Sequence, residues 1–458
     1  MDRIRKWFSQ QETQAYTALA SDPDSEASTL TPADVDIDID TDDSLPGGPI
    51  SKFQYFVFCL LGCAMLWSWN MFMACATYFQ RRFDGSDFLL TNFQSLILVS
   101  STVTNLAGSY WLSKRQATAD YPRRIWLSLV LNCVLTAVLA ASTVVWIVGP
   151  AAYIVVVLLC VVVAAWSTAL SQNGVFAFVN TFGGVYMQAV MTGQAIAGVL
   201  PAIAQIITVV LVPTTDTDSQ AASPKSAFLY FLTATSVSAL SLLLFFTLLA
   251  RHSSSTSTNK LPTDTTPATT TAPLETPATP HRKEVPLWTL FKKLRYLATA
   301  LWLTFFVTMA FPVYTQLIVS VRPLTPDTPR LFTPDVFIPL SFLIWNLGDL
   351  GGRLLCGVYQ WRGRPEALTL MALARVVFVP ALAACNVRGE GALVGGDVWY
   401  WSVQFAFGVS SGWVGSCAMI RAPEVVGRGE REAVGGFMGL CLVVGLAAGS
   451  AASFLVGA

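Results

Sequence analysis

Three polar side chains recur within one strongly apolar stretch, residues 341–353, at spacings that a helix places on one face. Asn346, Asp349 and Arg353 stand three and four residues apart, so a helix stacks them along one side and lets the last two form an ion pair. Charged side chains are costly inside a membrane unless they are paired or border water. Beside water, a carboxylate accepts hydrogen bonds from ligand hydroxyl groups, and a guanidinium donates to ligand acceptors.

This polar face has two interpretations. In the first, the three side chains line a hydrated cavity and bind a solute that carries hydroxyl groups. In the second, the ion pair neutralises itself and only ties helices together, while Gly348, Gly351 and Gly352 let a neighbouring helix approach closely. The amide of Asn346 adds a third polar group to the face and favours the cavity.

Two glutamines interrupt other apolar stretches. Gln172 carries a donor and an acceptor, so its amide can bind the edge of a planar heterocycle. Residues 173–174, Asn-Gly, follow it and are equally typical of a helix end. Gln194 is the lone polar insertion in a run of small side chains, in which Gly193 and Gly198 permit close helix contact.

An aromatic and a thioether side chain, Trp69 and Met73, stand one helical turn apart, with Asn70 between them. An indole beside a polar cavity offers a flat surface on which a planar ligand stacks. On composition alone, however, a lipid-facing or core position is favoured for Trp69.

The composition describes a membrane protein without obvious catalytic groups. Of the 458 residues, 53% are hydrophobic and 12% charged, with a mean hydropathy of +0.55, whereas soluble domains carry about 25% charged residues. The two histidines, His252 and His281, lie in polar connecting sequence, which disfavours a His-metal site or a Ser-His-Asp triad in the apolar body. We therefore expect no enzyme activity and no cofactor. Lys+Arg and Asp+Glu both number 28, so no net charge favours nucleic acid as a partner.

Eleven apolar stretches can each cross the roughly 30 Å apolar core of a lipid bilayer, which needs about 20 helical residues. Their approximate bounds are 53–79, 89–113, 124–147, 150–174, 185–212, 226–250, 296–320, 334–357, 366–386, 397–420 and 432–456. Gly149 and Pro150 separate two stretches that would together make a helix too long for the membrane. The expected fold class is an all-α integral membrane protein with 11 transmembrane helices in a 6+5 bundle.

A polar interruption divides these stretches into two groups. We expect a disordered acidic cytosolic tail (1–52), a first six-helix bundle (53–250), a flexible Ser/Thr/Pro-rich cytosolic linker (251–295) and a second five-helix bundle (296–458). With the amino terminus in the cytosol, twenty Lys and Arg residues fall in cytosolic segments and six on the opposite side, as the positive-inside rule favours. The carboxyl terminus then lies on the far side. Two bundles rocking about a central site are typical of transporters.

Several separated motifs, in order, resemble the equilibrative nucleoside transporter family. The resemblance covers residues 53–455 apart from the linker. The motifs are residues 69–73 followed by 78–79, residues 172–174, residues 191–194 with 197–198, residues 305–312, residues 346–353, and residues 432–435 with the Gly/Ala-rich helix that follows.

The resemblance implies passive, bidirectional transport of nucleosides by alternating access in a fold related to the major facilitator superfamily. Nucleobases are a further candidate substrate. It implies that Trp69 and Met73 line the base end of the pocket, that Gln172 hydrogen-bonds the nucleobase, and that Asp349 and Arg353 engage the ribose hydroxyls. Pocket packing and gating would fall to four further residues: Asn70, Gly193, Gln194 and Gly198.

Two alternatives stay open beside facilitative transport. The first is proton-coupled nucleoside transport, in which Asp349 titrates; the adjacent Arg353 favours the charged carboxylate and counts against it. The second is a membrane scaffold or sensor whose polar face binds a partner helix. The expected partners are nucleosides and the lipid bilayer, and the host membrane is either the plasma membrane or that of a vacuole or lysosome.

Overall fold

The computed structural model of the chain describes residues 50–83, 86–116, 118–145, 149–211, 224–258, 284–325 and 327–457. In these segments nearly all regular structure is helical, and an isolated bridge joins Ile318 to Val387. The expected acidic tail lies outside the described residues up to position 49, and so does the centre of the expected linker, residues 259–283. Helical structure covers both flanks of that linker.

The helices follow the expected apolar stretches closely. Those before the linker are α2 (Lys52–Ala74), α3 (Ala76–Arg82), α4 (Asp87–Lys114), α5 (Tyr121–Val145), α6 (Pro150–Val179), α7 (Gly184–Leu211) and α9 (Pro224–Thr258). Those after it are α10 (Leu287–Thr308), α11 (Ala310–Leu317), η1 (Arg330–Phe332), α12 (Pro334–Val358), α13 (Pro365–Ala374), η2 (Arg375–Val377), α14 (Phe378–Ala383), α15 (Asp397–Arg421), η3 (Ala422–Glu424), η4 (Arg428–Glu430) and α16 (Arg431–Gly457). We call α2–α9 the first half and α10–α16 the second half.

Proline and glycine set several of these boundaries. The stretch around Gly149 and Pro150 is divided as expected: α5 ends at Val145, and α6 begins with the proline at its first position, where the missing N–H costs nothing. Three expected spans are interrupted instead of continuous. In the span expected over 53–79, a turn at Cys75 separates α2 from α3. A turn at Met309 separates α10 from α11, and the short 3₁₀ helix η2 separates α13 from α14.

Nine segments of the described residues are long and apolar enough to cross a membrane. They correspond to nine of the expected spans, with α10 and α11 together forming one and α13 to α14 another. The helices α4 and α12, with 28 and 25 residues, occupy the remaining two expected positions but are not among the nine. The all-α membrane fold is therefore confirmed, and the count of eleven stays a prediction.

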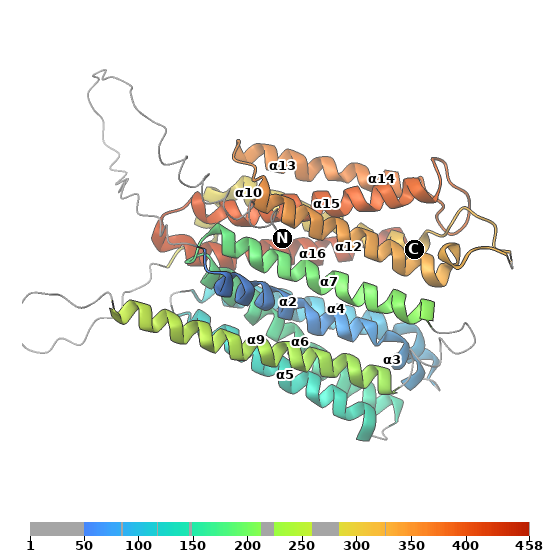
Figure 1. Ribbon diagram of the computed structural model, residues 1–458, viewed down its shortest axis with the longest axis horizontal. Coiled ribbons are helices and arrows are strands. Elements are labelled where there is room, and N and C mark those ends of the chain that lie inside the picture. Colours follow the sequence, from blue (N-terminus) through green and yellow to red (C-terminus); the bar gives the residue numbers. More distant parts are fainter. Residues whose placement is uncertain are drawn as a thin grey trace, which may run out of the picture. The chain divides into compact units, whose positions relative to one another are not determined.

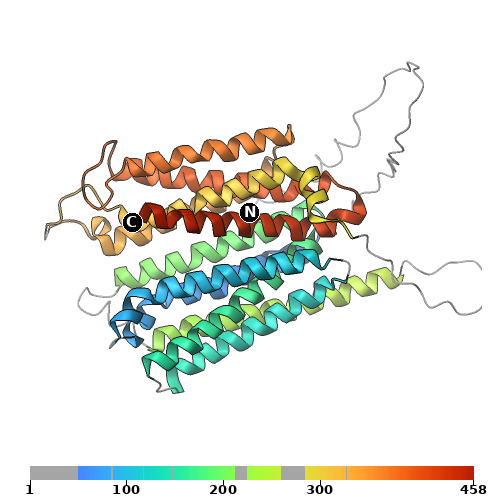
Figure 2. The ribbon, with the colours of Figure 1, turned by 180° about the vertical axis from the view of Figure 1, so that it is seen from behind.

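The helices run back and forth between two ends of the bundle (Figures 1 and 2). One of these ends carries Lys114, Arg364 and Arg421 at or beside helix termini, and we call it the basic end. Within the first half, α5 packs on α6 and α9; within the second, α12 packs on α15 and α10 on α16. Between the halves, α7 packs on α12, and α16 packs on α4 and α6.

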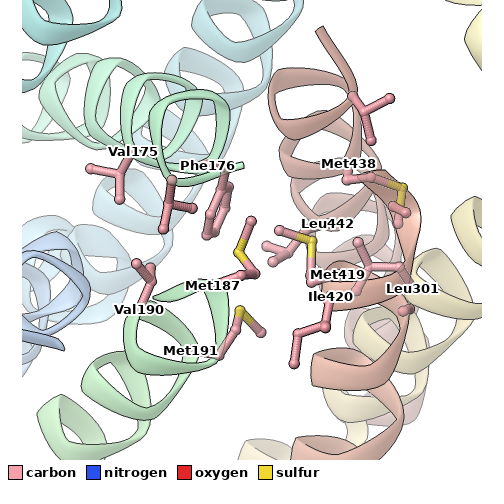
Figure 3. Close-up of a cluster of buried hydrophobic side chains, with 14 of the residues drawn as sticks. Val175, Phe176, Met187, Val190, Met191, Leu301, Met419, Ile420, Met438 and Leu442 are labelled. Atoms are coloured by element: carbon pink, nitrogen blue, oxygen red, sulfur yellow. The ribbon is translucent and has the colours of Figure 1, made fainter. Parts of the chain in front are cut away.

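An apolar cluster joins the two halves where these helices meet (Figure 3). The first half contributes Val175, Phe176, Met187, Val190 and Met191, and the second contributes Leu301, Met419, Ile420, Met438 and Leu442. All ten side chains are buried. Since burying one such side chain contributes about 1.5 to 3 kcal/mol, this cluster is a substantial apolar seal between the halves.

Candidate functional site

The ion pair expected from the sequence forms within α12 and is buried. Arg353 Nε donates to Asp349 Oδ2 over 2.8 Å, and the two residues are 6% and 5% exposed. Arg353 Nη1 continues the network into the first half: it donates to the backbone carbonyl of Met191 over 2.8 Å and to Gln194 Oε1 over 3.2 Å, both on α7. The guanidinium therefore bridges its own carboxylate and the facing helix.

Close backbone contact holds the pair from the other side. Gly408 and Gly412 of α15 lie against the backbone of Asp349, and a Cβ added at either glycine would overlap α12 backbone atoms. The small residues let the two helices touch, so the position of the carboxylate is fixed by α15 as well as by Arg353.

Asn346 and Gly198 contact each other about one helical turn from Asp349. The Asn346 amide donates to the Phe342 carbonyl of its own helix over 2.8 Å. Its Oδ1 lies against Gly198 of α7, where an added Cβ would overlap it. The α7–α12 contact thus carries three of the expected polar residues of α12 together with Gln194 and Gly198.

The first helix joins this contact through α7. Asn70 Nδ2 donates to the Ala197 carbonyl over 2.6 Å. Gly193 packs directly on the Cys59 backbone, so that a Cβ there would overlap the Cys59 carbonyl. Asn70 and Gly193 therefore fix α2 on α7 and act as packing residues in this structure.

Trp69 and Met73 line a separate cavity of about 210 Å³ between α2, α3 and α4. The walls are apolar apart from Gln94 and Ser95. The Trp69 ring stacks on Phe72, with centroids 6.3 Å apart and planes 10° apart, and Met73 is 48% exposed. An indole at the wall of such a cavity can stack on a planar ligand.

Gln172 is buried in α6, and its Oε1 atom has no hydrogen-bond partner in the described part of the chain. The neighbouring pair Asn173-Gly174 does not end the helix, because α6 continues to Val179. Asn173 instead accepts a hydrogen bond from Arg124 and donates to Ser113 Oγ over 3.3 Å. An interhelical network therefore occupies the position where the sequence was equally typical of a helix end.

The structure thus brings part of the expected site together. Asn346, Asp349, Arg353, Gln194 and Gly198 meet at the α7–α12 contact; Trp69 and Met73 line the α2–α4 cavity, and neither member of the ion pair does. In this conformation the ion pair ties helices together, as in the second interpretation of the sequence. Ligand binding by the pair stays a prediction.

Sequence reasoning gave no role to some residues of the interhelical contacts. Gln188 Nε2 donates to the Arg353 carbonyl over 3.5 Å, and Ser113 Oγ donates to the Gly436 carbonyl over 3.1 Å. Both are polar residues in apolar stretches, and that signal was present in the sequence.

Comparison with known proteins decides the family. A family profile described as "Nucleoside transporter" matches residues 158–458, about two thirds of the chain. This chain belongs to the nucleoside transporter family. It is 27% identical to nucleoside transporter FUN26 of Saccharomyces cerevisiae, over 90% of this chain and 86% of the yeast protein. It is 25% identical to human equilibrative nucleoside transporter 1, over 88% of this chain and 96% of the human protein.

Solved structures show the fold of this family member. The proton:xylose symporter XylE superposes with a TM-score of 0.58 at 10% identity, covering 88% of this chain and 87% of that structure. The E. coli fucose:proton symporter FucP gives a TM-score of 0.54 at 13% identity, covering 88% and 91%. At these identities the likeness shows the fold alone. The expected major-facilitator-like fold and the suspected family are both confirmed, and family and fold are those of transporters.

Proposed function

We propose that this protein carries nucleosides across a membrane down their concentration gradient by alternating access. The match of the nucleoside transporter family over residues 158–458 carries the proposal, because the matched region includes α7, α12 and the Asp349–Arg353 pair. The major-facilitator-like fold supports the mechanism, since such carriers move two helical bundles about a central site. Residues 53–250 and 296–458 are the proposed bundles.

The basic end is proposed to face the cytosol, as the positive-inside rule favours. There the halves touch through the apolar cluster of Figure 3. They are also joined by hydrogen bonds from Asn180 Nδ2 to the Arg431 carbonyl, 2.9 Å, and from Ser113 Oγ to the Gly436 carbonyl, 3.1 Å. These contacts support a conformation in which the proposed cytosolic side is closed.

The ligand site is proposed to extend from the α2–α4 cavity toward the ion pair. A purine or pyrimidine ring would stack on Trp69 beside Met73, and the free Oε1 of Gln172 would accept a hydrogen bond from the base. Asp349 would accept hydrogen bonds from the ribose hydroxyls. Arg353 binds α7 in the closed state, so separation of α7 from α12 would uncover the pair and open the cytosolic side in one movement.

Reconstituted protein tests this function. Proteoliposomes should take up labelled adenosine or uridine until the two sides are equal, with the same initial rate with and without a pH gradient, and an excess of unlabelled nucleoside should compete. Accumulation driven by a pH gradient would instead establish proton coupling. A scaffold or sensor would show neither uptake nor thermal stabilisation by nucleosides, and that result would refute the proposal.

A further inference from the structure

Arg375 is a buried cation in a helix that otherwise faces outward. It begins η2, the 3₁₀ segment between α13 and α14. The next two residues, Val376 and Val377, are 45% and 63% exposed, whereas Arg375 itself is 2% exposed. In the part of the chain that the structure describes, no carboxylate lies within ion-pair distance of it. A buried charge inside a membrane span is costly, so Arg375 is a candidate functional residue.

Neutral groups from two helices hydrogen-bond the guanidinium, and the Asp349 carboxylate attracts it from beyond ion-pair distance. Nη1 donates to the Thr304 carbonyl over 2.6 Å, and Nη2 donates to Thr308 Oγ1 over 3.0 Å, both on α10. Nε donates to Ser410 Oγ on α15 over 3.1 Å. The guanidinium carbon also lies 5.0 Å from the centroid of the Phe407 ring. The planar guanidinium thus donates through three nitrogen atoms, and the single ammonium group of a lysine cannot reproduce this geometry.

These acceptors stand at the interruption between α10 and α11. The helix α10 ends at Thr308, and α11 begins at Ala310. The carboxyl-terminal end of a helix carries partial negative charge, so a cation is favourable beside its last turns. Arg375 therefore joins the interruption of the α10–α11 span to the interruption of its own span.

Two helices beside Arg375, namely α15 and the α11 segment that follows α10, contact α12 near its ion pair. On α15, Phe407 and Ser410 alternate with Gly408 and Gly412, which lie against the backbone of Asp349. On α11, the Phe311 ring stacks on Trp345 of α12 at 4.0 Å, one helical turn before Asp349. A shift of the guanidinium would therefore move the supports of the carboxylate on two sides.

We propose that Arg375 is a positioning residue for transport, which clamps the α10–α11 interruption and α15 so that α12 presents Asp349 and Arg353 correctly. This inference rests on the proposed nucleoside transport. The groups that accept hydrogen bonds from Arg375 also have other hydrogen-bond partners. Thr308 Oγ1 also donates to the Thr304 carbonyl over 2.7 Å and contacts Ser411 Oγ at 3.1 Å, and Ser410 Oγ also donates to the Phe407 carbonyl over 2.8 Å. Loss of the guanidinium leaves each of these groups with a partner.

This redundancy separates positioning from simple stability. Arg375→Met removes a buried charge without orphaning a polar group, so its thermal unfolding temperature should equal or exceed that of the wild-type protein. Its nucleoside turnover at a low substrate concentration should fall at least about tenfold and its KM should rise, because a misplaced Asp349 and Arg353 would bind the ribose hydroxyls less tightly. Arg375→Lys should keep the charge and restore little of the turnover, because the fork geometry is lost.

The experiment measures turnover, KM and thermal unfolding in proteoliposomes, and hydrogen–deuterium exchange of residues 310–317 without nucleoside. Val376→Met, at the exposed neighbouring position, is the matched control and should behave as wild type. Faster exchange of 310–317 in Arg375→Met is expected. Wild-type exchange there, wild-type turnover in Arg375→Met, or full rescue by lysine would each overturn the clamp. Failure of wild-type protein to transport nucleosides would refute the proposed function, and the exchange result would still decide the clamp.

Discussion

Neutralising Asp349 tests both the energetics of the buried ion pair and its proposed function. In Asp349→Asn, the new amide oxygen can still accept the Arg353 Nε hydrogen bond that spans 2.8 Å in the structure, but the guanidinium loses its counter-charge. Both residues are at most 6% exposed, so solvent offsets little of this loss. Removing one partner of a buried pair costs about 3 to 5 kcal/mol, and we expect the thermal unfolding temperature to fall by several degrees.

The double variant Asp349→Asn with Arg353→Met removes the charge that the single variant leaves unpaired. We expect it to be more stable than the single variant, because a neutral pair carries no desolvation penalty, and to remain defective in nucleoside uptake, because both proposed ligand-binding groups are gone. Asp335→Asn, exposed in the first turn of the same helix, is the matched control. Unchanged uptake in a folded Asp349→Asn protein would refute the site. A double variant no more stable than the single variant would refute the ion-pair energetics.

Three further variants address the remaining parts of the site. Gly193→Leu should abolish uptake by forcing α2 from α7 at the Cys59 carbonyl, whereas uptake at the wild-type rate would show that this contact is dispensable. Gln172→Leu removes a buried acceptor that has no partner, so it should stabilise the nucleoside-free protein by about 1 to 3 kcal/mol while raising the KM for uptake; lower stability would contradict this. Asn180→Ala removes the bond to the Arg431 carbonyl. Thiol reagents added at the basic end should then label the buried cysteines faster than in the wild-type protein.

Local sequence patterns predicted the structural features that depend only on residues close together in the chain. The spacing of Asp349 and Arg353 predicted their ion pair, because one helical turn brings the two side chains together whatever surrounds the helix. Gly149 and Pro150 predicted a boundary between two helices, because proline removes a backbone donor and restricts the preceding residue. These features need no information from distant segments.

Other features depend on which distant helices meet, and no spacing rule supplies that. The partner of Arg353 outside its helix is the backbone carbonyl of Met191, a group that every residue carries and that is invisible in the sequence. The same is true of the Thr304 carbonyl that accepts from Arg375. Asn173 and Gly174 were equally typical of a helix end, but packing against Arg124 and Ser113 keeps them inside α6.

Burial of the ion pair is compatible with alternating access, because the pair lies within one helix. Opening of the α7–α12 contact would break the bonds from Arg353 to Met191 and Gln194, whereas the bond to Asp349 would move with α12 as a unit. A hydrogen bond from a charged group contributes about 1.5 to 3 kcal/mol net, and two such bonds suit a carrier whose states differ by a few kcal/mol.

The apolar cluster of Figure 3 is the larger obstacle to opening. Each of its side chains contributes about 1.5 to 3 kcal/mol when fully buried, and the first half supplies five of the ten that the figure labels. The balance between closed and open states should therefore respond more to the size of residues such as Met187 and Met438 than to loss of one interhelical hydrogen bond. Under the proposed function, the apolar seal would set how often the carrier opens, and the ion pair would bind the nucleoside when it does.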